Sequence, residues 1–165
     1  MGMQLIETVE VGSGGAASIE FTSIPQDGLV LLCVYSIRHD GSENEALNLT
    51  FNNSTNYNYV FLTGDGSSAS SLAGTGATNG FAGYVNWSGS TTNTFGNAQV
   101  LVPNYAGSNT KSYSVDAVSE NNATNARAGI QANSWNNTSA ITSLKLFRTS
   151  RTLQQYSTAS LYIIS

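Results

Sequence analysis

Apolar and polar residues alternate with a period of two along much of this chain. In residues 17–24 (ASIEFTSI), Ile19 and Phe21 point to one side, while Glu20 points to the other. Residues 46–51 (ALNLTF) repeat the pattern. Such alternation is typical of β-strands with one face in a core and the other in solvent.

Short segments of this kind recur between clusters of Gly, Asn, Ser and Asp. We find no window of a dozen residues with apolar positions spaced as in an amphipathic helix. The pattern predicts an all-β protein with about ten short strands, an antiparallel sandwich or barrel. The predicted strands are residues 5–11, 17–24, 29–37, 46–51, 57–62, 81–87, 98–105, 111–119, 126–135, 140–147 and 159–164.

Residues 29–37 (LVLLCVYSI) differ because they are apolar on both faces. We expect a central strand, with a second sheet on one side and a neighbouring subunit on the other. Cys33, the only cysteine, lies inside this run, so we interpret it as a small buried hydrophobic residue. A single cysteine also excludes an intrachain disulfide.

Residues 63–80 (TGDGSSASSLAGTGATNG) form the longest stretch without strand character. Small residues dominate it, and we predict a long surface loop. Neither a linker nor a tandem repeat interrupts the chain, so residues 1–165 are predicted to form one domain.

The composition narrows the choice of partners. Charged residues make up 10% of the chain, and the net charge is −4. The six basic residues are scattered, which disfavours nucleic-acid binding. No apolar run approaches the roughly 20 residues that a membrane-spanning helix needs. The first residues lack the pattern of a signal peptide, so we expect synthesis in a cytoplasm and no membrane partner.

Residues 114–130 (SVDAVSENNATNARAGI) gather acids and asparagines. Asp116 and Glu120 are four residues apart and should face the same side of a strand. Calcium usually requires more carboxylates, on a loop turned by glycine. Asparagine is common in tight turns. We therefore predict the tip of a β-hairpin here and no metal or other cofactor.

Residues 39–45 (HDGSENE) carry the densest charge. Their spacing resembles the start of a calcium-binding EF-hand loop, but Glu45 stands where that loop requires glycine. His39 is the only histidine, and no Gly-x-Ser-x-Gly elbow accompanies it. We interpret the segment as a solvated turn. With both acid clusters read as turns, the paired carboxylates of a glycosidase are missing, and no enzymatic activity is expected.

Aromatic residues in polar surroundings are the remaining candidates for contact. Such rings stack on sugars, and they are also common in subunit interfaces, which we favour. These residues are Tyr57, Tyr59, Tyr84, Trp87 and Trp135.

The amino-acid sequence resembles a recurring pattern in small virion proteins of tailed bacteriophages. The segments that carry it are LIETVEVGSGGAASIEFTSIPQDGLVLLCVYSIR, LNLTFNNSTNYNY, VPNYAGSNTKSYSVDAVSENNAT and ITSLKLFRTSRTLQQYSTASLYII. The likeness extends from about Leu5 to Ile164, with divergence expected in residues 63–80. It implies a jelly-roll-like β-sandwich that serves as a structural part of the particle, typically as a homotrimer made in the bacterial cytoplasm.

Two functions follow from this resemblance. The first is a capsid decoration, or cement, protein that binds the major capsid protein or other virion proteins. In that case the outer face of residues 29–37, with Tyr113 or Tyr162, would be buried between subunits. The second is a tail- or fibre-associated module that binds host-surface carbohydrate. Its contacts would be Tyr84, Trp87 and Trp135, with residues 63–80 shaping the site.

Overall fold

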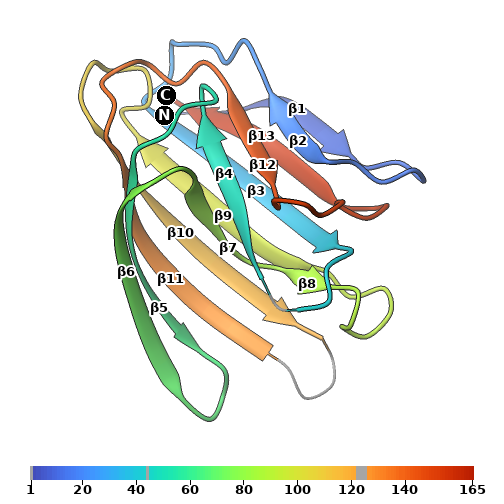
Figure 1. Ribbon diagram of the computed structural model, residues 1–165. Helices are drawn as coiled ribbons and strands as arrows, with labels where there is room; N and C mark the ends of the chain where they lie inside the picture. The colour runs from blue at the N-terminus through green and yellow to red at the C-terminus, as the bar shows by residue number, and fades with distance from the viewer. Residues whose placement is uncertain (1, 44, 122–125) are drawn as a thin grey trace.

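The computed structural model describes residues 2–43, 45–121 and 126–165 (Figure 1). Within these ranges it contains thirteen strands and no helix, so the all-β prediction is confirmed. In chain order the strands are β1 (Met3–Glu10), β2 (Ser18–Phe21), β3 (Val30–His39), β4 (Ala46–Phe51), β5 (Tyr57–Gly64), β6 (Ala69–Ala77), β7 (Gly80–Tyr84), β8 (Asn86–Trp87), β9 (Gly96–Pro103), β10 (Lys111–Glu120), β11 (Ala126–Trp135), β12 (Leu144–Phe147) and β13 (Thr158–Ile164).

The strands form two antiparallel sheets that pack as a sandwich. The large sheet has the order β1-β13-β3-β9-β10-β11-β5-β6, and the small sheet has the order β2-β12-β4-β7. The short strand β8 pairs in parallel with the end of β3.

Pairing within the sandwich is nested along the chain. The first strand pairs with the last (β1 with β13), and β2 pairs with β12. Further in, β3 pairs with β9 and β4 pairs with β7. These pairs alternate between the two sheets, which is the arrangement of a jelly roll. The jelly-roll-like sandwich is therefore confirmed.

Two hairpins widen the large sheet beyond this eight-stranded framework. The chain inserts β5 and β6 between β4 and β7, and it inserts β10 and β11 between β9 and β12. Strand β10 extends the sheet from β9, and β11 joins it to β5. Figure 1 shows β5 and β6 at the side of the sandwich opposite β1. The insertions give the large sheet a broad surface that faces away from the small sheet.

The predicted surface loop at residues 63–80 is wrong in its central part. Residues 69–77 form β6, which pairs antiparallel with β5. The side chain of Asp65 starts the hairpin, because it accepts hydrogen bonds from the amides of Ser67 and Ser68 at 2.9 and 2.8 Å. This Asx turn returns the chain alongside β5, and backbone pairing then forms a strand from residues of low strand propensity.

The core lies between the two sheets and follows the predicted alternation. Ile19 and Phe21 are buried on β2, and Leu47 and Leu49 are buried on β4. Cys33 is also buried, and burial raises the pKa of its thiol, so its interpretation as a small hydrophobic residue is confirmed.

Candidate functional site: the outer face of the large sheet

The large sheet turns one set of side chains into the core and the other away from it. Strand β10 shows this most clearly, since buried and exposed residues alternate over its whole length. Lys111, Tyr113 and Val115 point inward, whereas Ser114 and Asp116 point outward. The small sheet covers only the inner set, and no other described part of the chain packs over the outer set.

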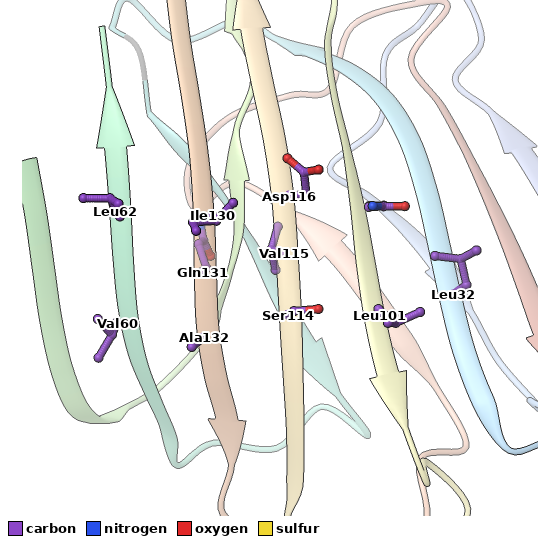
Figure 2. Close-up of a pocket in the computed structure, with 11 residues that line it drawn as sticks. Leu32, Val60, Leu62, Leu101, Ser114, Val115, Asp116, Ile130, Gln131 and Ala132 are labelled. Atoms are coloured by element: carbon purple, nitrogen blue, oxygen red, sulfur yellow. The ribbon is translucent and has the colours of Figure 1, made fainter. Parts of the chain in front are cut away.

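The strand register aligns the outward residues into two rows across five strands (Figure 2). One row consists of Leu32, Leu101, Ser114, Ala132 and Val60, and the next consists of Val34, Gln99, Asp116, Ile130 and Leu62. We call these ten residues the outer face. Seven of them are apolar, although the surface is open to solvent.

Most of the apolar residues on this face are strongly exposed, while Leu32 and Leu101 are half-buried. Ile130 is 61% exposed, Val60 is 54% and Leu62 is 51%. Five strands about 4.8 Å apart span about 24 Å, and two rows that are each about 7 Å deep span about 14 Å, which gives an area of roughly 350 Å². Exposed apolar patches of a few hundred Å² commonly mark interaction sites on soluble proteins.

The face is also hollowed. A depression of about 520 Å³ lies over β10 and β11, between Leu62 and Val60 on one side and Leu101 on the other (Figure 2). A second depression of about 590 Å³ adjoins it toward Asn58 and Ser112. Concave shape and apolar lining together suit a protein surface that fits into the hollow.

The chemistry of this face favours contact over catalysis. Asp116 is the only charged residue in either row, with Gln99 and Ser114 as its polar neighbours. The apolar members are aliphatic, so they offer no aromatic plane on which a sugar could stack. Full burial of an exposed leucine or isoleucine contributes about 1.5–3 kcal/mol, and covering these partly exposed side chains would contribute a fraction of that each.

Three of the five residues predicted to make interface or glycan contacts are buried within the chain. Trp87 is 8% exposed, Tyr113 is 3% and Trp135 is 0%. Their expected exposure is therefore wrong. Tyr113 and Trp135 pack around Phe51, with ring centroids 5.3 and 5.7 Å from its ring.

Polar residues around these aromatic rings do not mean that the rings are exposed. In the folded chain, polar residues cover them. Trp135 Nε1 donates a hydrogen bond to Ser54 Oγ at 3.4 Å, so the turn before β5 closes over the indole. Tyr57, also predicted at the surface, is fully buried, and its hydroxyl accepts a hydrogen bond from the Phe51 amide.

The other two predicted contact residues are half-buried. Tyr162 lies on β13 between Leu5 and Leu32 in the strand register, so it extends the first row of the outer face. Tyr84, at the end of β7, lies under the guanidinium of Arg127, which is 4.7 Å from its ring centroid. The structure thus brings only Tyr162 next to the outer face.

Residues 114–120 and 126–130 lie on the paired strands β10 and β11, so the predicted hairpin is confirmed for the described part of this segment. Asp116 and Glu120 point to the same side of β10, and both are exposed. The asparagines predicted for the tip at 122 and 125 lie outside the described residues. Among the residues that the structure does describe, no three His, Cys, Asp or Glu side chains gather closely enough to hold a metal ion.

Residues 39–45 form a solvated turn only in part: Asp40, Ser42 and Glu43 are exposed, but the two ends of the segment are not free in solvent. His39 is fully buried at the end of β3, and its Nδ1 accepts a hydrogen bond from the Gly41 amide. Glu45 forms ion pairs with Arg148 at 2.6 Å and Arg151 at 3.1 Å. These two arginines lower the pKa of Glu45 to about 2. The segment is anchored because its charges find partners about 100 residues away in the sequence.

Two buried cations were not recognised from the sequence. The ammonium of Lys111 donates hydrogen bonds to the carbonyl oxygens of Gly107, Asn109, Thr138 and Ser139. Arg38 similarly donates to the carbonyl oxygens of Ser88, Ser90, Thr91 and Thr94. Both hold loops in place through backbone oxygens, which leave no trace in a sequence pattern.

No described helix has the length and apolar character needed to cross a membrane. Comparison of the chain with known protein families, with curated protein sequences and with solved structures finds no match in any of the three.

Proposed function

We propose that this protein is an accessory virion structural protein, a capsid decoration or cement protein that binds a phage head and stabilises its shell. The observation that carries the proposal is the outer face, an exposed aliphatic surface on a chain whose core is already complete. Such a surface gains free energy when another protein covers it. The sequence resemblance to small phage virion proteins is the reason for proposing a phage particle as the binding partner.

The outer face would associate copies of the chain into a homotrimer. Leu62 and Ile130 have no covering side chains within the described structure and lie in a hollow that a convex partner surface would fill. Tyr162 beside Leu32 widens the same surface. Loops at the ends of the sandwich would then contact the major capsid protein, and attachment at several points would strengthen binding without a large contact per copy.

The arrangement of acidic residues supports a structural role without enzymatic activity. Glu45 is held between two arginines, and Glu20 forms an ion pair with Lys145 at 2.8 Å. Asp65 accepts hydrogen bonds from its own turn. Each of these carboxylates is engaged in maintaining the fold, and the proposal needs neither a cofactor nor a metal.

The test begins with the purified protein and with phage particles that lack it. We expect a trimeric mass by sedimentation equilibrium, saturable binding to the particles, and greater resistance of the decorated particles to heat. A protein that remains off the particles under these conditions would contradict the cement function.

A second candidate is a tail- or fibre-associated module that binds host-surface carbohydrate. It is favoured by a row of aromatic rings beside β7. Tyr59 and Phe81 have centroids 4.5 Å apart, and the Arg127 guanidinium lies over Tyr84. Tyr59, Phe81 and Tyr84 are all partly exposed, and aromatic rings with a nearby guanidinium suit stacking and hydrogen bonding to sugars.

The two candidates are separated by one pair of variants. Tyr84→Ala should weaken binding to host cells or their polysaccharide if the protein binds carbohydrate, while Tyr156→Ala, at an exposed tyrosine elsewhere, should not. If the protein is a cement protein, both variants should coat particles as the wild type does and neither should bind the polysaccharide.

A further inference from the structure

The free edges of the two sheets differ in how they are protected. A strand at a sheet edge presents unpaired backbone groups, and natural proteins usually block such edges with charges, bulges, short strands or covering elements. The four edge strands are β1 and β6 of the large sheet and β2 and β7 of the small sheet. Three of them carry protection along their length, whereas in β6 it is confined to one end.

Strand β1 has a bulge between Leu5 and Glu7, and Glu7 and Glu10 place negative charges along it. Strand β2 is only four residues long, and Glu20 on it pairs with Lys145. Strand β7 contacts β10 and β11 of the large sheet and has a register shift between Ala46 and Asn48 of its partner strand.

Strand β6 has a register shift only near its end, between Gly74 and Ala77, and residues 69–74 carry none of these protections. Its nine residues, ASSLAGTGA, include no charged residue and no proline, and almost all of them are exposed. Outside the sheet ladders, backbone hydrogen bonds within the described chain reach Ser68 and Ala77 at its two ends, and none reaches residues 69–74. Figure 1 shows β6 as the outermost strand on its side of the sandwich.

The side chains of β6 leave residues 69–74 of the edge accessible. Gly74 lies beneath the ring of Tyr59, its partner on β5, and a Cβ at this position would lie 2.5 Å from the tyrosine ring. Leu72 is opposite Phe61 on the side of the sheet that faces the core, yet it is 52% exposed. The small sheet does not extend far enough to cover it.

We infer that β6 is a docking edge for β6 of a second copy of this chain, paired antiparallel about a twofold axis. Two β6 strands with Leu72 opposite Leu72 would join two large sheets into one continuous sheet. The two leucines, each half exposed in the single chain, would then cover one another. Directly opposite residues in an antiparallel pair have Cβ atoms about 4.5–5.5 Å apart.

The charge pattern favours a copy of the same strand as the occupant. Like charges directly opposite each other destabilise a strand pair, and a strand paired with itself brings identical residues close together. Because β6 has no charge, self-pairing carries no such penalty, whereas Glu7 and Glu10 would impose it on β1.

The outer face is continuous with this edge. Val60 is the last member of its row on β5, and Ala73 follows it on β6. A twofold axis perpendicular to the sheet keeps both outer faces on the same side, so the two apolar surfaces would adjoin. The contact is isologous and uses up both free β6 edges, so it ends at a pair instead of growing into a fibre.

The pairing is tested by sedimentation of the full chain over a range of concentrations. We expect reversible association in steps of two, either of monomers or of the proposed trimers. Leu72→Lys should weaken this step at least tenfold, because it removes the leucine contact and places two positive charges opposite each other. Leu29→Lys is the matched control, since Leu29 is a 65% exposed leucine in a turn away from β6.

This association and the proposed trimer fail independently. Leu72→Lys should weaken only the twofold step, whereas Leu62→Glu on the outer face should abolish only the trimer. An unchanged twofold step in Leu72→Lys, or the absence of any twofold step in the wild type at millimolar concentration, would overturn the inference.

The register is tested by oxidation of single-cysteine variants in a Cys33→Ala background. Leu72→Cys should form an intermolecular disulfide, while Ser70→Cys should not, because Ser70 would lie opposite Gly74. Equal cross-linking of the two variants would rule out this register. The control is the unfolding of the cross-linked Leu72→Cys dimer in denaturant. A midpoint equal to that of the reduced chain would show that folded chains, and not misfolded ones, formed the disulfide.

Discussion

The carboxylate of Glu45 and the guanidinium of Arg148 meet at 2.6 Å, although 103 residues separate them in the sequence. Glu45 precedes β4, and Arg148 follows β12, the neighbouring strand of the small sheet. With Arg151 on its second oxygen, the pair fixes the segment between β3 and β4 against the turn after β12.

This ion pair makes stability depend on acidity. The pKa of Glu45 is lowered from 4.5 to about 2 in the folded chain. The stabilisation is therefore complete above the pKa of the unfolded chain and is lost as the pH falls from about 4.5 through about 2. Glu45→Gln should lower the free energy of unfolding at neutral pH by about 1–2 kcal/mol. The difference from the wild type should shrink in acid, as measured by urea denaturation.

The control for this experiment is Glu43→Gln, at an exposed residue in the same segment. It should leave the pH profile unchanged. A constant difference between Glu45→Gln and the wild type from pH 7 to pH 2 would show that ionisation of Glu45 does not contribute to stability.

Replacement of Lys111 should be among the most damaging changes of a charged residue. Lys111→Met fills a similar volume but leaves buried carbonyl oxygens of two loops without their donor. We expect a loss of about 2–4 kcal/mol in the free energy of unfolding. Lys145→Met, which breaks the partly exposed pair with Glu20, should cost at most about 1 kcal/mol. Equal effects of the two variants in urea denaturation would contradict the buried role of Lys111.

Leu62→Glu should separate self-association from folding. Because Leu62 is half exposed on the outer face, the isolated chain should lose little stability, within about 0.5 kcal/mol. A trimer formed through this face should dissociate, because each copy would bury an unpaired carboxylate. Leu29→Glu, the same change at an exposed leucine off this face, should keep its mass in sedimentation equilibrium.

Gly83 should tolerate no side chain. Its φ is +84°, and a Cβ would lie 2.3 Å from the Cβ of Ala117 on the facing large sheet. Gly83→Ala should therefore lower the free energy of unfolding by at least about 1–3 kcal/mol. Gly64→Ala is the control, because its nearest neighbour would be 3.8 Å away. A thermal midpoint for Gly83→Ala within a degree of that of the control would contradict the close packing of β7 on β10.

Alternation of apolar and polar residues along the chain is sufficient to predict most of the strands. Ile19 and Phe21 turn inward because a strand reverses its side chains at every residue. The pairing of β10 with β11 followed from an asparagine-rich segment between two alternating segments. These features depend on neighbours within a few residues, which a sequence displays directly.

Which aromatic side chains are buried was decided by the tertiary structure alone. Trp135 and Tyr84 were both predicted as surface contacts, yet Trp135 is fully buried because a distant turn closes over its ring, and Tyr84 is partly exposed. Likewise, β6 exists because β5 offers it a backbone ladder, not because its small residues favour a strand.

The outer face combines both kinds of information. The apolar outer side of residues 29–37 was visible in the sequence, but its extension through Leu101 and Ile130 to Val60 required the strand register. Register places residues dozens of positions apart in one row, and it is fixed by turns, bulges and packing across the whole sandwich. The sequence therefore determined which residues point together along each strand, and only the folded sheets determined which strands place them side by side.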